Sequence, residues 1–245
     1  MLEVEGLSKS FGGLKAVSDV CLQINEGELS SIIGPNGAGK STFFNLLGGK
    51  FRPDSGKILF QGEDITGLPP HKVCRKGMSK SFQRQNIFPR LNAFENIQIA
   101  VLSEQKRIRN LALPAGRQCR AETDQVLERV GLEDKRDNLA GYLSYGDQKR
   151  LEIGIALATR PRLLLLDEPT AGMSPDETVT ITHLIQKLAR EQRLTLLFVE
   201  HDMSVVFGIS EKIRVMHLGR IIAEGNPEEV QSNPEVQRIY LGETA

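Results

Sequence analysis

The glycine-rich run at residues 34–42 constrains this chain more than any other stretch, because its spacing is G-x-x-x-x-G-K-S-T. Glycines at these positions let the backbone curl until several N–H groups point at bound phosphates. The apolar run at residues 29–33 predicts a buried strand before the loop, and residues 41–49 predict the first turns of a helix after it. Strand, loop and helix in this order predict a phosphate-binding site rather than an ordinary glycine-rich turn.

This loop is expected to hold the phosphates of a nucleotide and the magnesium ion that accompanies them. Lys40 should reach the β- and γ-phosphates, and the hydroxyl of Ser41 should ligate Mg²⁺. The residues expected to contact the nucleotide here are Gly34, Pro35, Asn36, Gly37, Ala38, Gly39, Lys40, Ser41 and Thr42.

The composition is that of a globular protein without a strong charge of either sign. Hydrophobic residues make up 40% of the 245 residues, charged residues make up 25%, and the formal net charge is +0. Such a chain is not expected to bind nucleic acid or an anionic bilayer directly. No apolar run approaches the roughly 18 residues of a membrane span, and the N-terminus lacks the form of a signal peptide. Cys21, Cys74 and Cys119 are far apart, which indicates free thiols in a reducing cytosol.

Strands that alternate with helices around the glycine loop predict an α/β fold with a parallel sheet. The run at residues 163–167, which is apolar up to its final acid, and the mainly apolar run at 194–199 fit strands buried on both faces of that sheet. Residues 2–10 and 14–24 alternate apolar and polar residues, so an antiparallel β subdomain is expected at the N-terminus.

A mainly helical stretch at about 84–158 is inserted between the predicted strands, and Asp147 is expected to cap its last helix. We interpret it as a subdomain rather than a separate domain. The chain is thus expected to be a single domain over residues 1–245, with a core at 1–83 and 159–245.

Two carboxylates, Asp167 and Glu168, come directly after the apolar run at 163–166. The carboxyl ends of parallel strands beside a phosphate loop are where ligands bind in such sheets. We expect Asp167 to act on Mg²⁺, directly or through water, and Glu168 to orient or deprotonate the attacking water. The alternative is a pair of surface acids, but carboxylates at the end of a buried strand are costly unless a cation neutralises them.

Two further polar residues lie at predicted strand ends. His201 can donate a hydrogen bond to the γ-phosphate and sense its loss, although a lone histidine at such a place is more often structural. The amide of Gln83 can touch Mg²⁺ or water and report the γ-phosphate to the helical stretch. The predicted catalytic residues are therefore Glu168, His201 and Gln83, and the predicted metal contacts are Ser41, Gln83 and Asp167.

Two weaker patterns each leave a packing alternative open. Phe11, at the turn between the first two strands, is either a packing residue or a ring stacked on adenine with Val17 beside it. The loop at 143–148, LSYGDQ, leads into a helix, where the Ser144 hydroxyl, the Gly146 backbone and the helix N-terminus make a second phosphate grip. An ordinary helix cap is the alternative there.

In their order and spacing these motifs resemble the ATP-binding subunits of ABC transporters over nearly the whole chain. The resembling features are Walker A at 34–42, the Q-loop glutamine Gln83, the signature at 143–148, Walker B at 163–167 with Glu168, and the switch histidine His201. The resemblance implies a P-loop NTPase core, an ATPase activity, and ATP with Mg²⁺ as ligands. Phe11 stands where the family has its adenine-stacking aromatic.

The resemblance also implies an assembly. Two such subunits pair head to tail around two ATP molecules, and each ATP is held by Walker A of one subunit and by Ser144 and Gly146 of the other. ATP then links the subunits, and loss of its γ-phosphate opens them. The motion passes near Gln83 to two transmembrane permease subunits, which work with a substrate-binding protein. This subunit is thereby expected to be peripheral, at the cytoplasmic face of the membrane.

Membrane partners are expected to contact the loop at residues 84–95. A groove there, with exposed apolar side chains at Phe88, Leu91 and Phe94, would accept a short cytoplasmic helix of a permease. The alternative is that these side chains belong to the hydrophobic core.

This chain departs from the family pattern at two places. The signature reads LSYGDQ instead of LSGGQ, and Asp147 is expected to weaken triphosphate binding unless Lys149 or Arg150 compensates. Ser174 stands where the D-loop usually has an aspartate, which affects the connection between the two ATP sites.

Within the family, the stretches SYGDQKRLEIGIAL and AGMSP and the ending NPEVQRIYLGE resemble the subunits of branched-chain amino acid importers. The resemblance implies uptake of branched-chain or other hydrophobic or neutral amino acids. An importer of urea or short-chain amides, or a non-transport ATPase of the same fold, is the alternative. Non-transport relatives usually carry a coiled-coil insertion or two tandem halves, and this chain has neither.

Overall fold

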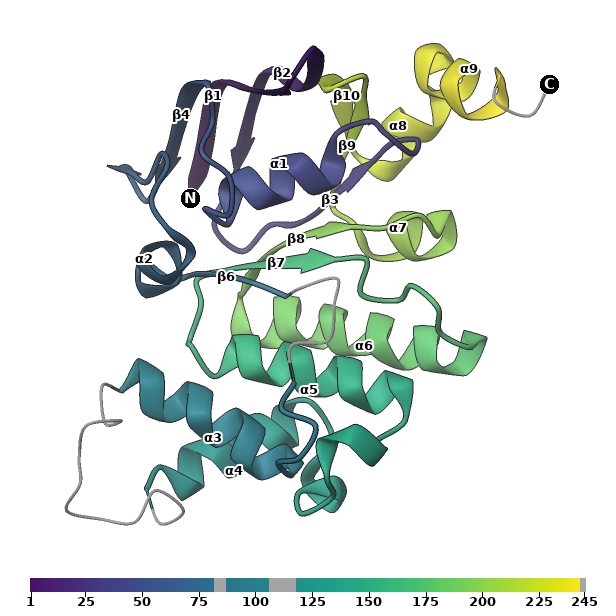
Figure 1. Ribbon diagram of the computed structural model, residues 1–245. Helices are drawn as coiled ribbons and strands as arrows, with labels where there is room; N and C mark the ends of the chain where they lie inside the picture. The colour runs from purple at the N-terminus through teal and green to yellow at the C-terminus, as the bar shows by residue number, and fades with distance from the viewer. Residues whose placement is uncertain (82–86, 106–117, 243–245) are drawn as a thin grey trace.

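The computed structural model describes residues 1–81, 87–105 and 118–242 and contains two β-sheets with helices between and beside them (Figure 1). The smaller sheet is antiparallel and has the order β2-β1-β4-β5, with bounds Leu14–Ile24, Leu2–Phe11, Ser55–Phe60 and Glu63–Asp64. The antiparallel pair predicted at the N-terminus is therefore confirmed, and it continues into β4 and β5.

The larger sheet has six strands in the order β10-β9-β3-β8-β7-β6. Its strands span Arg220–Gly225, Lys212–His217, Leu29–Ile33, Thr195–Val199, Leu163–Asp167 and Met78–Lys80. All neighbouring pairs are parallel except β10 with β9. Every residue of β3, β7 and β8 is buried, which confirms the expectation that apolar runs form strands covered on both faces.

Alternate residues of the central strands enter two different hydrophobic clusters, because successive side chains of a strand point to opposite faces. On one face, Leu163 and Leu165 join Phe43 and Phe44 of α1 (Lys40–Leu47) and the apolar side of the antiparallel sheet. Helix α1 thus lies between the two sheets, as Figure 1 shows.

On the other face, Leu164 and Leu166 pack with α6 (Pro175–Gln192), α7 (Met203–Ile209) and the helical part of the chain. The remaining helices of the core are α2 (Pro70–Arg75), α8 (Pro227–Ser232) and α9 (Pro234–Gly242).

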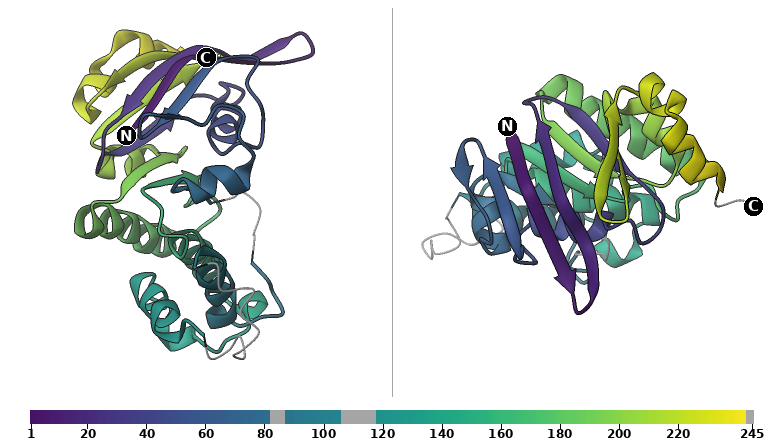
Figure 2. Two further views of the ribbon diagram at one scale, coloured as in Figure 1. Left: turned by 90° about the vertical axis from the view of Figure 1, so that its left-hand side faces the viewer. Right: turned by 90° about the horizontal axis from the view of Figure 1, so that it is seen from above.

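The helical part contains α3 (Ala93–Glu104), α4 (Arg120–Arg129), α5 (Tyr145–Leu157) and the short helices η3 (Glu133–Lys135) and η4 (Ala140–Tyr142). It lies at the opposite end of the molecule from the antiparallel sheet (Figure 2). Ile97 of α3 and Leu151 of α5 belong to the same buried cluster as Leu164 of β7 and Ile185 of α6. One continuous core therefore joins the helical part to the sheet, and the boundaries at 84 and 158 stay a prediction.

Two local expectations are wrong. Ser144, not Asp147, is the N-cap of α5, and its hydroxyl accepts the N–H of Asp147. Phe94 is buried rather than exposed, because the first turn of α3 packs into the core, whereas Phe88 is 53% exposed. Gln83 lies outside the described residues.

Over the residues that the structure describes, no helix combines the length and the apolar character that crossing a membrane would require.

Candidate nucleotide site

The glycine loop connects β3 to α1 and is packed so tightly that two of its glycines leave no room for a side chain. A Cβ at Gly34 would lie 2.0 Å from the carbonyl oxygen of Met216, and one at Gly39 would lie 2.2 Å from that of Ala16. Gly39 also has φ 101°, a backbone conformation that side chains disfavour. The neighbouring strand and the N-terminal sheet thus hold the loop in its curled form.

Helix α1 begins at Lys40 without a side-chain cap, and its first turn carries no acidic residue. The N–H groups of an uncapped first turn are free to bind an anion, and the helix dipole favours one. Ser41 and Thr42 lie half-buried in this turn, and Ala38 is buried behind it. This arrangement fits the phosphate-binding role predicted for residues 34–42.

Lys40 is held at the mouth of the loop by backbone oxygens. Its Nζ donates to the carbonyl oxygens of Gly34 (2.6 Å) and Pro35 (3.0 Å), and the residue is only 6% exposed. Burial lowers the pKa of Lys40, while the negative charges of Glu168 and Asp167 oppose this shift. The glycine loop and the two acids therefore lie within electrostatic reach of one another, as the sequence predicts.

Asp167, at the end of β7, has the features of a cation ligand. One of its oxygens lies 3.1 Å from Nζ of Lys80, and among the described residues the other, Oδ1, is buried without a hydrogen-bond partner. An unpaired buried carboxylate oxygen is costly unless a ligand completes it. Mg²⁺ fits this donor set, because it is usually bound by one or two protein oxygens together with nucleotide phosphates.

Glu168 and His201 form a pair at the same edge of the sheet. Nε2 of His201 lies 3.1 Å from Oε1 of Glu168. Glu168 follows β7 and His201 follows β8, and these neighbouring parallel strands place Asp167 beside Val199. Glu168 has φ 51°, and its N–H donates to the carbonyl of Val199 at 2.9 Å. The left-handed backbone turns this side chain out of the line of the strand.

Glu200, which the sequence analysis did not single out, binds the backbone next to both members of this pair. It is 2% exposed, and its Oε1 accepts the N–H (2.7 Å) and the hydroxyl (2.6 Å) of Thr170. Its Oε2 accepts the N–H of His201 at 3.0 Å. Glu200 thus connects Thr170, in the loop after Glu168, to the backbone of His201. An acid at the end of an otherwise apolar strand, next to a histidine, is the signal that could have identified it.

The predicted adenine-binding residues differ in exposure. Phe11 is 44% exposed, and its ring meets the edge of the Phe51 ring, with centroids 5.3 Å apart. Val17 is completely buried in the cluster around α1, so its side chain presents no open surface. Phe51, which lies beside Phe11, is an aromatic that the sequence analysis missed.

Ser144 and Gly146 lie apart from these residues, in a shallow pocket of about 210 Å³ between the start of α5 and α6. The N–H of Gly146 donates to Oε1 of Glu177 at 3.1 Å. Asp147 is buried, and its carboxylate pairs with Lys135 and Arg150. Arg150 therefore compensates Asp147, as one of the two candidates expected, whereas Lys149 contacts Glu152 at 3.1 Å.

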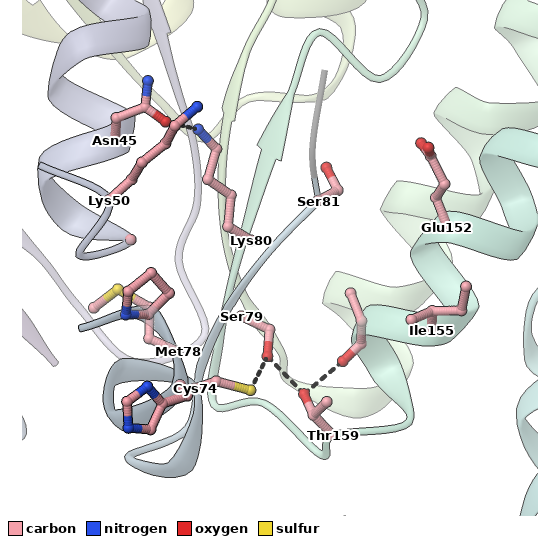
Figure 3. Close-up of a pocket in the computed structure, with 14 residues that line it drawn as sticks. Asn45, Lys50, Cys74, Met78, Ser79, Lys80, Ser81, Glu152, Ile155 and Thr159 are labelled. Atoms are coloured by element: carbon pink, nitrogen blue, oxygen red, sulfur yellow. Dashed lines mark hydrogen bonds between the residues drawn. The ribbon is translucent and has the colours of Figure 1, made fainter. Parts of the chain in front are cut away.

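A larger pocket, of about 360 Å³, opens where β6 leaves the sheet (Figure 3). Lys80 donates to Oδ1 of Asn45 (2.9 Å) at one end, and Ser79 and Thr159 share a 2.6 Å hydrogen bond at the other. Because Lys80 also contacts Asp167, this pocket borders the predicted metal site. Its lining residue Ser81 is close in the sequence to Gln83, which lies outside the described residues.

Comparison with known protein families gives two matches within this chain. The family described as "ABC transporter" matches residues 17–171. The family described as "Branched-chain amino acid ATP-binding cassette transporter" matches residues 220–245.

Individual relatives and solved structures resemble nearly the whole chain. The chain is 44% identical to the high-affinity branched-chain amino acid transport ATP-binding protein BraF of Pseudomonas aeruginosa, over 99% of this chain and 98% of BraF. It is 39% identical to the lipopolysaccharide export system ATP-binding protein LptB of Haemophilus influenzae, over 99% and 98%. A dimeric ATP-binding cassette solved in a post-hydrolysis state with ADP and Pi matches with a TM-score of 0.79 at 28% identity, over 93% of this chain and 99% of that one.

Proposed function

Because this chain belongs to the ABC transporter family, we propose that it is the ATP-hydrolysing subunit of an importer for branched-chain amino acids. The observation that carries the hydrolytic part is the convergence of Lys40, Asp167 and the Glu168–His201 pair at one edge of the parallel sheet. The C-terminal family match and the name of BraF favour branched-chain amino acids over the lipopolysaccharide in the name of LptB.

In this proposal the loop N–H groups and Lys40 hold the β- and γ-phosphates of ATP. Ser41, Asp167 and Gln83 would hold Mg²⁺, which neutralises charge on the phosphates when bound. Glu168 accepts a proton from the attacking water, and His201 donates a hydrogen bond to the γ-phosphate. The 3.1 Å contact between His201 and Glu168 supports these two roles, because each side chain orients the other before ATP binds. Phe11, which is partly exposed, would contact the adenine, whereas the Val17 side chain is buried.

The second phosphate grip belongs to a second copy of this type of subunit. Ser144 and Gly146 lie in a pocket of their own, so a nucleotide held at residues 34–42 needs another subunit to reach such a grip. We infer a dimer, with the same chain or a close relative, that closes around two ATP molecules. The dimeric form of the related cassette supports this assembly.

The membrane partners are two permease subunits that work with a substrate-binding protein, and this subunit binds them from the cytoplasmic side. We place their docking site at the predicted loop 84–95. The pocket lined by Ser79 and Lys80 supports this place, because these residues come shortly before the loop in the sequence and Lys80 contacts Asp167. Phe88, which is exposed, adds apolar surface on this loop. A partner bound in this pocket could contact Lys80, which in turn contacts Asp167, the predicted metal ligand.

Glu168→Gln tests the proposed activity. The amide cannot accept the proton of the attacking water, so ATP hydrolysis should fall by roughly two to four orders of magnitude. ATP should still bind, and size-exclusion chromatography with ATP should show a trapped dimer of two 27.2 kDa chains. The matched control is Glu191→Gln, an exposed acid near the C-terminal end of α6. This variant should leave the hydrolysis rate and the elution of the protein unchanged. Normal hydrolysis by Glu168→Gln would contradict the role given to Glu168.

A further inference from the structure

Glu177 has no role in the proposed chemistry, yet its two carboxylate oxygens join two separate turns. Oε2 accepts hydrogen bonds from the N–H (3.1 Å) and the hydroxyl (3.0 Å) of Ser174, at the start of α6. Oε1 accepts the N–H of Gly146, in the first turn of α5, at 3.1 Å. One side chain therefore connects the D-loop position Ser174 to the signature position Gly146.

The contact between Glu177 and α5 is close, and the acceptor carries a negative charge. A Cβ at Gly146 would lie 2.9 Å from Oε1 and 3.1 Å from Cγ of Glu177, so any larger residue here would displace the Glu177 side chain. The backbone N–H of Ser174 most strongly, and also its hydroxyl and the N–H of Gly146, hold the pKa of the Glu177 carboxyl below its usual range. The group is therefore a carboxylate near neutral pH, and its hydrogen bonds are charge-assisted.

The turn that ends at Ser174 leads back to the catalytic acid. The N–H of Ala171 donates to the carbonyl of Glu168 at 3.3 Å. Thr170, between them in this turn, is fixed by Glu200, which also binds the N–H of His201. Contiguous hydrogen-bonded elements of this kind can carry coupling between sites.

We propose that Glu177 is a positioning residue that couples nucleotide contact at Gly146 to the loop carrying Glu168. This inference rests on the proposed function, in which the N–H of Gly146 faces the γ-phosphate of ATP held by the other subunit. That phosphate competes with Oε1 for the same N–H and repels the carboxylate, so Glu177 moves and takes the Ser174 turn with it. ATP at one site of the dimer thereby adjusts Glu168 of the other site.

Glu177→Gln separates this coupling from the structural role of the helix cap. A glutamine retains one acceptor oxygen, which can cap α6 at Ser174 but cannot serve Gly146 at the same time. Glu191→Gln, at an exposed position near the C-terminal end of the same helix, is the matched control. All measurements use the full-length chain.

The expected result is a loss of cooperativity without a loss of binding. Wild type and Glu191→Gln should hydrolyse ATP with a Hill coefficient of about two, and Glu177→Gln with one of about one. The affinity of the isolated subunit for ATP should change less than about twofold in Glu177→Gln, because the glycine loop is untouched. Rates of amide hydrogen exchange at residue 146 should rise about tenfold in Glu177→Gln, as expected for one lost charge-assisted hydrogen bond.

Two results would overturn the inference. One is a Hill coefficient that is the same in wild type and Glu177→Gln, whether that value is high or low. The other is unchanged amide exchange at residue 146, which would mean that Glu177 does not hold this turn. Failure of the proposed function would give a different result, because wild-type protein would then hydrolyse no ATP. The amide exchange measurement would still report on the contact between Glu177 and Gly146.

Discussion

At the scale of single residues, Lys80 is the cation that pairs with the buried carboxylate of Asp167. It lies 3.1 Å from Asp167 and 2.9 Å from Asn45, and its ammonium stands 5.7 Å from the centre of the Phe44 ring. Burial lowers the pKa of Lys80, and the charge of Asp167 opposes that shift. The ion pair therefore neutralises a carboxylate that would otherwise be isolated in the protein interior.

Lys80→Met should leave Asp167 buried without its counter-ion. We expect the free energy of unfolding without nucleotide to fall by about 3–5 kcal/mol, as for other buried pairs that lose one partner. ADP with Mg²⁺ should recover a larger share of stability in this variant than in wild type, because a cation then returns to Asp167. Urea unfolding with and without Mg²⁺ and ADP measures both effects.

Lys76→Met is the control for this experiment. Lys76 pairs with Glu63 at the surface, where the lysine side chain is 44% exposed, so its loss should cost at most about 1 kcal/mol. Equal losses in the two variants would contradict the special position of Lys80.

At the scale of elements, the start of α5 is held by charges that compensate each other. Asp147 sits in the first turn, where a negative charge is favoured by the helix dipole. Burial acts to raise the pKa of Asp147, but Lys135, Arg150 and Ser144 together outweigh it, and the pKa is lowered. The unusual acid of this signature is therefore neutralised inside its own subunit rather than turned toward a nucleotide.

The lowered pKa of Asp147 predicts how stability depends on pH. Because its native pKa lies below the unfolded value of about 3.9, its stabilising contribution is present above pH 4 and disappears as pH falls through the native pKa. Asp147→Asn should thus be less stable than wild type at pH 7, and the gap should narrow below pH 4. Urea unfolding across this range tests it, with Asp134→Asn, an exposed acid of η3, as control. A gap that stays constant with pH would mean that the Asp147 charge does not matter.

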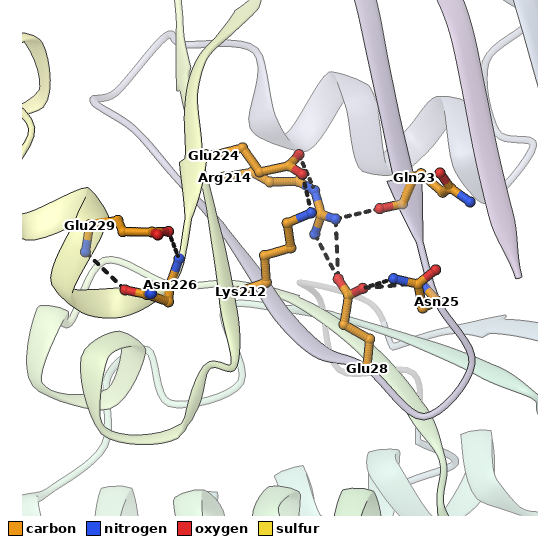
Figure 4. A network of polar contacts seen from close by, with 8 residues as sticks. All are labelled: Gln23, Asn25, Glu28, Lys212, Arg214, Glu224, Asn226 and Glu229. Atoms are coloured by element: carbon orange, nitrogen blue, oxygen red, sulfur yellow. Dashed lines mark hydrogen bonds and ion pairs between the residues drawn. The ribbon is translucent and has the colours of Figure 1, made fainter.

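At the scale of the whole molecule, Arg214 joins the two sheets (Figure 4). It lies in β9, is 0% exposed, and donates to Glu224 of β10 at 2.9 Å. It also donates to Glu28, just before β3, through both terminal nitrogens at 3.1 Å, and to the carbonyl oxygen of Gln23 in β2. A single guanidinium therefore binds three separate parts of the chain, which its fixed fork of donors allows.

Arg214→Met should destabilise the whole molecule rather than one sheet. It leaves Glu28 without its buried partner, so the free energy of unfolding should fall by about 3–5 kcal/mol. Arg214→Lys should recover only part of this, because an ammonium cannot reach three acceptors in the geometry of a guanidinium. Denaturant unfolding followed by circular dichroism measures the loss, and Arg238→Met, an exposed position on α9, is the control. A change no larger than that of the control would argue against this linking role.

The sequence alone determined the strands of the core, the glycine loop and the order of the acids, because each is encoded locally. Strands buried on both faces must be apolar, as at Leu163–Asp167, and a curled phosphate loop needs glycine where the backbone approaches its neighbours, as at Gly34 and Gly39. The roles given to Gln83, Ser144 and Val17 stay predictions.

Tertiary structure alone decided which side chains meet across elements. Ser144 and Asp147 are both good capping residues, so propensity could not choose between them, whereas Lys135 and Arg150 draw Asp147 into pairing and leave the cap to Ser144. The contacts of Lys80 with Asp167, Glu200 with Thr170 and Glu177 with Gly146 likewise join segments far apart in the chain. Local periodicity carries no information about such pairs, because they exist only after the strands have taken their order in the sheet.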